Sequence, residues 1–313
     1  MKMNLKNIIF ILGVLFLGSS CENFLDVHPK GEVTGKELLK DRKGFENALY
    51  GVYATMRNQT LYGRYLSYYT LDVMAQYYTS FGNTYVSELR AFNYKQTDVE
   101  TEFYNIWCKM YNNISNVNNI LENLDNISAS SLKYYPIYKG EALALRAFLH
   151  FDLLRLYGPS PAVGKEHKAI PYMEEFTNIA SRRLTVNQVL EKVAADLNKA
   201  RELMREVDSY GPNYADLEET YAQDKRLKNR RFHLNYYAAT ALLARVQLYA
   251  GNTTEALAAA REIIGTAETL PVAPFELVTE VTSADRLFQN ELLFGLEMKQ
   301  MKVVISDYFG EAA

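Results

Sequence analysis

The sequence predicts a mainly α-helical protein built from tetratricopeptide-like helical hairpins, with long loops and a few short β-strands. Three observations predict this class: apolar residues recur at helical spacing, capping signals precede several of these runs, and an alanine-rich helix–turn–helix occurs near residue 250. The 313 residues are 48% hydrophobic and 23% charged, which is typical of a globular chain. The formal net charge of -3 disfavours nucleic acid as the main partner.

The N-terminus has the pattern of a secretory signal over residues 1–20. Basic residues precede an apolar run from Ile8 to Leu17, and small residues follow it. The run is too short for a membrane-spanning helix, which needs about 20 residues. Cys21 directly after the small residues indicates a bacterial lipoprotein, lipidated at that cysteine and tethered to a membrane. Leu17 lies four residues before Cys21 rather than three, so an ordinary signal peptide with an incidental cysteine is the alternative.

Helical spacing and capping signals predict five helices in the first two thirds of the chain. Capping boxes begin at Thr34, Thr97 and Thr185, where a threonine is followed three residues later by Glu or Gln. Gly158-Pro159 ends the fourth helix. We expect 79–96 to be a loop with a short strand. The expected helices cover 34–56, 62–78, 97–124, 132–157 and 185–204.

The remaining third is predicted to hold a polar loop, a helical hairpin and two strands. The loop covers 208–231, and the strands cover 291–298 and 303–305. The hairpin joins helices at 235–250 and 253–264. It looks like a tetratricopeptide unit, with small Ala244 where the helices touch and Gly251-Asn252 at the turn. Such hairpins bury their apolar faces only by stacking, so we expect the helices at 132–157 and 185–204 to form a similar pair.

Catalytic, metal and cofactor motifs do not occur in the sequence. The four histidines lack metal-ligand spacing, and no Cys-x-x-Cys, nucleophile-elbow or phosphate-binding loop is present. Glu100 with Glu102, or Glu174 with Glu175, could form a glycosidase pair, but solvated helix charges explain them better. We therefore predict a protein that is not an enzyme and has neither cofactor nor metal. Cys108 is expected to be an unpaired buried thiol.

The 24 tyrosines fall into two groups. Those within helical patterns are expected to pack between helices: Tyr50, Tyr53, Tyr104, Tyr111, Tyr157, Tyr236 and Tyr249. A second group lies in or beside the loop at 79–96. Sugars present flat C–H faces and many hydroxyls, so aromatic rings with amide or guanidinium donors suit them. In and beside this loop, the candidate ligand residues are therefore Tyr77, Tyr78, Asn83, Tyr85 and Arg90.

Several segments, in order, resemble the SusD/RagB family of nutrient-binding lipoproteins of the Bacteroidetes outer membrane. The most specific is Glu141–Phe148 followed by Phe151–Leu153 and Leu156–Gly158. Arg146, Asp152 and Arg155 in this stretch are expected to make contacts that fix the fold. The other segments are Cys21–Asp26 with Pro29, Phe45–Tyr53, Ile170-Pro171, the positions Arg183, Thr185, Val189, Asp196-Leu197 and Ala200, and Asn290–Phe294.

The resemblance implies a SusD-like α-α superhelix and a role in nutrient uptake. Residues 21–313 would form one SusD-like domain, with an N-terminal part to about 230 and a hairpin plus the start of a C-terminal part over 232–313. Members of the family bind glycans, or sometimes peptides, and partner a TonB-dependent SusC-like transporter. The region between the early helices helps to build the family's ligand site, which supports the tyrosine candidates. Family members are commonly longer, which indicates a truncated reading frame or a fragment.

The expected function is therefore capture of glycans or peptides by a lipid-anchored protein of the outer membrane, at the cell surface. Two other functions remain as alternatives. A helical-repeat scaffold lipoprotein would bind a protein partner and no small oligomer. A secreted hydrolase would depend on one of the glutamate pairs. Three measurements distinguish these functions. Binding to glycan or peptide panels favours capture, and co-purification of a protein other than a transporter, without ligand binding, favours the scaffold. Turnover that a single carboxylate substitution abolishes favours the hydrolase.

Overall fold

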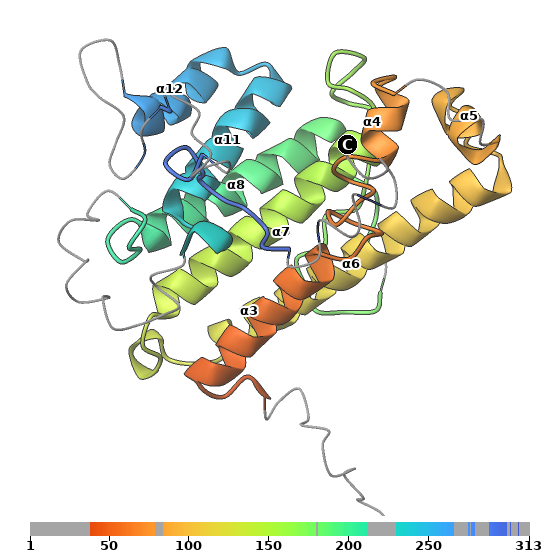
Figure 1. Cartoon of the computed structure of the whole chain (residues 1–313). Coiled ribbons are helices and arrows are strands. Elements are labelled where there is room, and N and C mark those ends of the chain that lie inside the picture. The colour runs from red at the N-terminus through yellow and green to blue at the C-terminus, as the bar shows by residue number, and fades with distance from the viewer. Residues whose placement is uncertain are drawn as a thin grey trace, which may run out of the picture. The chain divides into compact units, whose positions relative to one another are not determined.

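Eight α-helices make up most of the part of the chain that the computed structural model describes (Figure 1). The described residues are 38–78, 84–179, 181–211, 230–265, 275, 277–278, 288–298, 301 and 306, and those from Leu39 onward belong to one unit. The helices are α3 (Arg42–Met56), α4 (Thr70–Met74), α5 (Thr84–Arg90), α6 (Thr97–Asp125), α7 (Tyr135–Tyr157), α8 (Val186–Met204), α11 (Tyr236–Ala250) and α12 (Thr253–Ile264), with short 3-10 turns η2 (Ala129–Ser131) and η3 (Arg230–Phe232).

Helix α7 lies at the centre of the packing, between α6 and α8. Its sequence has no continuous polar face, as a helix that is covered on nearly every side requires. Its apolar and small residues are buried around most of the helix. Gly140 lets α7 approach α8 closely, because a Cβ atom there would lie 2.6 Å from the Cγ atom of Met204. The predicted pairing of the helices at 132–157 and 185–204 is confirmed.

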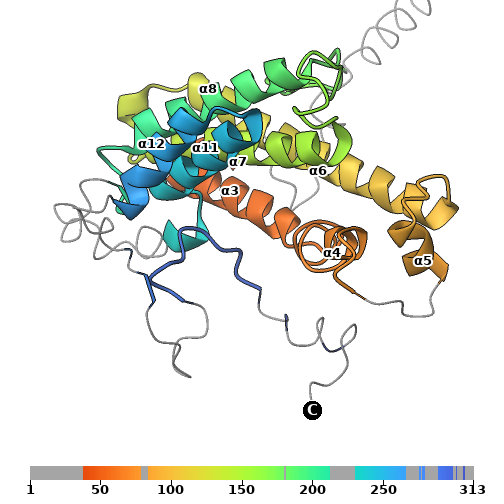
Figure 2. The same cartoon turned by 90° about the horizontal axis from the view of Figure 1, so that it is seen from above.

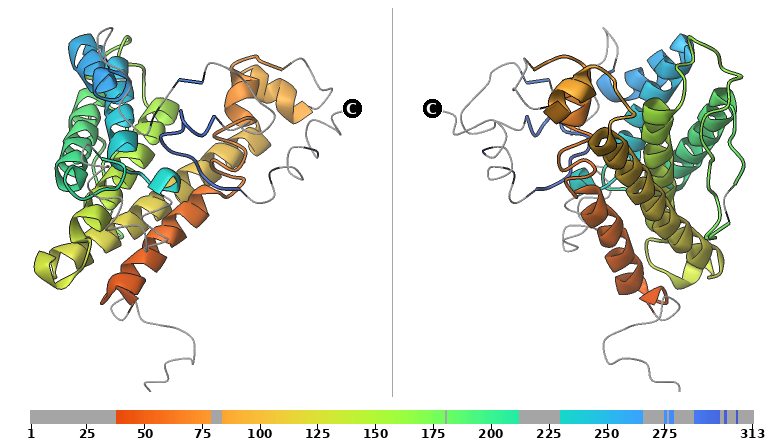
Figure 3. Two further views of the ribbon diagram at one scale, coloured as in Figure 1. Left: turned by 60° about the vertical axis from the view of Figure 1, so that its left-hand side comes forward. Right: turned by 90° about the vertical axis from the view of Figure 1, so that its right-hand side faces the viewer.

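The remaining helices extend this core in two directions. Helix α11 packs against α8 and α12, while α3 runs beside α6 (Figures 1 and 3). Short helices α4 and α5 contact each other, and α5 contacts α6, so both lie near the N-terminal end of that long helix (Figure 2). None of the described helices has both the length and the apolar character needed to span a membrane.

The α11–α12 hairpin has the predicted tetratricopeptide-like form. Gly251 ends α11 with φ +82°, a left-handed conformation that favours glycine. The amide of Asn252 donates to the carbonyl of Gln247 at 2.8 Å and closes the turn. Ala256 and Ala259 of α12 are buried, as close helix packing requires.

The capping predictions had different outcomes. The box at Thr185 is confirmed, since its hydroxyl accepts from the amide of Gln188 at 3.2 Å and the Gln188 side chain accepts from the Thr185 amide at 3.0 Å. The box at Thr97 is wrong by one residue, because the longer side chain of Gln96 folds back onto the amides of Asp98 and Val99. The box at Thr34 lies outside the described residues.

Two predictions around residues 57–96 are wrong. Only α4 of the expected helix 62–78 is helical, because turns occupy 57–69. Asn58 accepts from the amide of Thr60 at 2.9 Å, and a Cβ atom at Gly63 would clash with the carbonyl of Arg57. Conversely, α5 lies where we expected a loop and a strand. Its buried Val86 and Leu89 join a small core cluster with Val73 and Val99.

The predicted strand at 291–298 is also wrong. Its backbone is tied instead to groups of helical regions: the Asn235 amide donates to the Leu293 carbonyl at 2.9 Å, and the Gly295 amide donates to the Arg231 carbonyl at 3.0 Å. Within the described segments, the β-structure is a single bridge between Lys168 and Thr185. The predicted strand at 303–305 and most of the predicted loop 208–231 lie outside the described residues.

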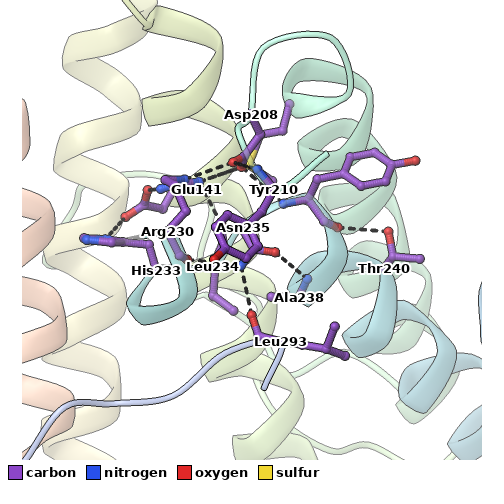
Figure 4. Close-up of polar contacts among 12 residues, drawn as sticks. Glu141, Asp208, Tyr210, Arg230, His233, Leu234, Asn235, Ala238, Thr240 and Leu293 are labelled. Atoms are coloured by element: carbon purple, nitrogen blue, oxygen red, sulfur yellow. Dashed lines mark hydrogen bonds and ion pairs between the residues drawn. The ribbon is translucent and has the colours of Figure 1, made fainter. Parts of the chain in front are cut away.

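Both described ends of that predicted polar loop are buried in a charged network (Figure 4). Arg230 is fully buried and pairs with Glu141 of α7 and with Asp208, the latter at 2.8 Å. His233 lies 2.9 Å from the other Glu141 oxygen. Asp208 also accepts from the amide of Tyr236 at 3.2 Å, so the network holds the start of α11 against α7.

Two expectations about burial along the helices are corrected. Cys108 is exposed rather than buried, and Tyr104, four residues earlier, is 66% exposed on the same stripe of α6. Tyr50 is also 47% exposed, although it contacts the ring of His233. The other helical tyrosines pack as expected: Tyr53 and Tyr236 are buried, and Tyr111, Tyr157 and Tyr249 are partly buried.

Candidate functional site

A polar cleft of about 360 Å³ opens where α5 and the turns after α3 meet the N-terminal half of α6. We call it the tyrosine cleft, after three tyrosines that line it. Arg64, Tyr65 and Tyr69 come from the turns, and Tyr85 comes from α5. The wall on α6 is formed by Asp98, Thr101, Glu102 and Asn105, and Thr60 completes the lining.

The three tyrosine rings form a row. Tyr65 and Tyr69 have ring centroids 6.1 Å apart with planes 28° apart, and Tyr69 and Tyr85 lie 6.5 Å apart with planes 7° apart. The Arg64 guanidinium lies over the ring of Tyr65, 4.3 Å from its centroid. Nearly parallel rings beside a multidentate donor offer both an apolar surface and hydrogen-bonding groups to one ligand.

Glu102 of α6 holds one end of this row in place through a hydrogen bond from Tyr85. Its side chain is buried, and its carboxylate accepts hydrogen bonds from the hydroxyls of Thr70 and Tyr85. Burial raises the pKa of Glu102, whereas these hydroxyl donors and the charge of Arg64 act in the opposite direction. Burial and the bond to Glu102 raise the pKa of Tyr85, so its phenol stays neutral and fixed in orientation.

Of the four predicted ligand residues that the structure describes, Tyr85 is the one that lines the cleft. Tyr78 donates to the carbonyl of Tyr68 at 2.7 Å, and Arg90 donates to the carbonyl of Tyr78, so these two lie together and tie α5 to the segment before it. Tyr77 is 77% exposed and does not line the cleft. Asn83 lies outside the described residues. A ligand role for all five residues stays a prediction.

The sequence did not single out Arg64, Tyr65 and Tyr69 as lining residues, and it offered Glu102 only as half of a glycosidase pair that solvated charges explained better. The spacing Arg64-Tyr65-x-x-x-Tyr69 was a usable signal, but it fell inside a predicted helix where tyrosines are expected to pack. Glu102 is buried rather than solvated, while Glu100 is exposed. The structure therefore does not bring this glutamate pair together across one cleft. Within the described part of the chain, no three Cys, His, Asp or Glu side chains are placed to hold a metal ion.

The stretch that resembles the family most specifically lies beside this region and is structural. Arg146 donates to both carboxylate oxygens of Asp196, at 2.6 and 2.8 Å, and to Asn118 of α6 at 3.2 Å. Asp152 accepts from Tyr62 at 2.9 Å and lies 3.5 Å from Arg155. The expectation that these groups fix the fold is confirmed for Arg146 and Asp152, whose partners lie on other segments, whereas the ion pair of Arg155 lies within α7.

Comparison with known proteins places these features in a family. The SusD-like family described as starch-binding and associating with the outer membrane matches residues 23–215, which include the whole tyrosine cleft. SusD-like protein P38 of Formosa agariphila is 28% identical over 204 residues, covering 64% of this chain and 37% of the relative. The chain thus spans about a third of the length of this curated relative.

Solved structures show the same fold. A SusD superfamily protein from Bacteroides thetaiotaomicron VPI-5482 superposes with a TM-score of 0.55 at 24% identity, covering 75% of this chain and 47% of that one. A laminarin binding SusD-like protein superposes with a TM-score of 0.52 at 18% identity, covering 76% and 47%. The matched region exceeds half of the sequence, and the chain belongs to the SusD-like family.

Proposed function

We propose that this protein is a lipid-anchored surface protein that captures glycan oligomers in the tyrosine cleft and delivers them to a TonB-dependent SusC-like transporter. The observation that carries the ligand class is the row of Tyr65, Tyr69 and Tyr85 with Arg64 above it. Rings supply the apolar face that a sugar stacks on, and the guanidinium supplies donors for its hydroxyls. The family description as starch-binding supports the same class.

The proposed role is binding without turnover. Catalytic glycoside hydrolysis needs two carboxyl groups facing one bond, whereas Glu102 is buried and already accepts two hydroxyl donors. Its remaining function in the cleft is to orient Tyr85. The cleft therefore holds a ligand in place while the partner transporter moves it.

Isothermal titration with maltoheptaose and laminarihexaose, and with a peptide panel, tests the ligand class. We expect saturable binding of a glycan, weakened by Arg64→Gln and unchanged by Arg183→Gln, an exposed arginine away from the cleft. Binding of peptides alone would replace glycan by peptide as the ligand. Absence of any binding would contradict the proposal.

Membrane attachment and the partner are tested separately. We expect Cys21→Ala to move the protein from the membrane fraction to the soluble fraction in a cell that processes lipoproteins, whereas Cys108→Ala leaves it in the membrane. Retention of the Cys21 variant would contradict lipid attachment at this residue. Affinity capture from detergent-solubilised outer membranes should recover a TonB-dependent transporter, and its absence would contradict the delivery role.

A further inference from the structure

A second cavity lies on α6, lined by an aromatic pair and by the segment after α7. We call it the tryptophan pocket. Trp107, Tyr111, Ser115 and Asn118 contribute from α6, and the lining from residues 171–181 includes Met173 and Asn178. Its volume is about 260 Å³. No residue of this lining is shared with the tyrosine cleft.

The two cavities open on opposite faces of α6. A helix turns by about 100° and rises by about 1.5 Å per residue. Asp98, Glu102 and Asn105 therefore share one face, and Trp107 and Tyr111 lie on the other. At that rise the midpoints of the two sets of lining residues lie roughly 17 Å apart along the helix axis.

The wall of the tryptophan pocket is held in place by hydrogen bonds from α6. The Tyr111 hydroxyl donates to the carbonyl of Pro171 at 2.8 Å. The Asn118 amide donates to the carbonyls of Met173 at 2.9 Å and Glu175 at 3.2 Å. These bonds fix the segment 171–175 against the helix, so the pocket exists before a ligand arrives.

His150 of α7 fixes the same wall from beneath. Its Nε2 atom accepts from the amide of Met173 at 3.0 Å, so its Nδ1 atom carries the proton and donates to the carbonyl of Arg146 at 2.9 Å. Burial lowers the pKa of His150 to about 3, which keeps this neutral tautomer over the physiological range. The ring also stacks on Tyr172, 3.9 Å between centroids.

The groups that remain for a ligand have a distinct chemistry. The apolar part of the lining is formed by the rings of Trp107 and Tyr111 with Pro171 and Met173. Among the polar lining residues, the side chains of Ser115, Glu175 and Asn178 make no hydrogen bond to any described residue. The lining includes no lysine or arginine. A flat, uncharged ligand with hydroxyls at its edge satisfies both parts, and an anionic ligand does not.

We propose that the tryptophan pocket is a second carbohydrate site, which stacks one pyranose ring of a neutral glycan on Trp107 and hydrogen-bonds its hydroxyls through Ser115 and Asn178. It takes the ligand class of the proposed function but is a separate site. Together, two sites on opposite faces of α6 would let separate segments of a long glycan engage one molecule, which raises its overall affinity.

Trp107 is the only tryptophan of the chain, so its fluorescence reports on this pocket. We expect maltotriose or laminaritriose to cause a saturable change in its emission. Ser115→Ala and Asn178→Ala should each raise the dissociation constant measured from this signal by about five- to tenfold, which is the effect of one lost hydrogen bond. Asn112→Ala removes the same amide from an exposed position of α6 and should change nothing.

The tyrosine cleft supplies a second control. Tyr69→Ala should leave the trisaccharide-dependent emission change intact while it weakens binding at the cleft, measured by calorimetry. An emission that no trisaccharide changes, in a protein that still binds glycan by calorimetry, would overturn the second site and leave the proposed function standing. Loss of the emission change in Tyr69→Ala, or its insensitivity to the substitutions of both Ser115 and Asn178, would also overturn it. A failure of glycan binding by both methods would overturn the proposed function as well.

Discussion

Two buried glutamates show how the core of this protein differs from its cleft. Glu141 is fully buried and pairs with Arg230 and His233, and Arg230 in turn pairs with buried Asp208. Glu102 is also buried, but its partners Thr70 and Tyr85 are neutral, and the tyrosine faces an open cleft. A closed charged network fixes one arrangement of helices, whereas an open one can fix ring positions and still leave surface for a ligand.

The largest effect is expected from breaking the closed network. Arg230→Met leaves Glu141 and Asp208 buried without their cation, so we expect the free energy of unfolding to fall by about 3–5 kcal/mol in urea denaturation. Arg261→Met, on the exposed side of α12, should change it by less than about 0.5 kcal/mol. Equal effects of the two substitutions would contradict a structural role for the network.

Two helical glycines test how tightly the core is packed. Gly140→Ala places a Cβ atom against Met204, and we expect a loss of about 1–3 kcal/mol in the free energy of unfolding. Gly51 of α3 has open space around the added atom, so Gly51→Ala should stabilise the protein by about 0.5–1 kcal/mol. Thermal and urea unfolding measure both changes, and stabilisation by Gly140→Ala would show that α7 and α8 are further apart.

The cleft is tested by binding rather than by stability. Tyr69 is the middle ring of the row, so Tyr69→Ala should weaken glycan affinity by about tenfold or more, as loss of an aromatic anchor does. Tyr77→Ala, an exposed ring outside the cleft, serves as the matched comparison in the same calorimetric titration. A larger loss from Tyr77 than from Tyr69 would move the site to the predicted 77–78 segment.

The smallest expected effect concerns the pH dependence that Glu102 introduces. Because its pKa in the folded protein is raised above 4.5, the folded state binds the proton more tightly than the unfolded state does. Stability from this group is therefore present below pH 4.5 and is lost as pH rises through the raised pKa. Relative to Glu102→Gln, the wild type should lose stability from pH 4 to pH 8.

Urea denaturation at both pH values measures this difference. Glu100→Gln removes a charge from an exposed position of the same helix and should show the same pH dependence as the wild type. A wild-type protein that gains stability relative to Glu102→Gln as pH rises would show that hydrogen bonding to the carboxylate outweighs its burial.

The long helices and the α11–α12 hairpin could be predicted because periodicity and capping act locally. Thr185 and Gly251 illustrate this, since each contacts residues within five positions of itself. Helix α5 could not, because its form depends on packing among Val73, Val86 and Val99, which are separated along the chain. The same holds for 291–298, whose backbone is bound by Asn235 and Arg231.

For the candidate site, the sequence named one residue, Tyr85, that the structure places in the lining of the tyrosine cleft. The tyrosine excess and the break between helices pointed to Tyr85. Tyr65 and Tyr69 could not be identified from the sequence, because a tyrosine in a helical pattern usually packs between helices. The helix is interrupted there by turn geometry at Asn58 and Gly63. The burial of Arg230 and Asp208 could not be predicted either, because charged residues in a polar stretch are usually exposed.

The most direct test of the central claim is a crystal structure of the protein with the glycan oligomer that binds it most tightly by calorimetry. Our account predicts a sugar ring stacked on the row of Tyr65, Tyr69 and Tyr85, with its hydroxyls within hydrogen-bonding distance of Arg64. A glycan bound elsewhere, with the tyrosine cleft empty at a saturating concentration, would contradict it.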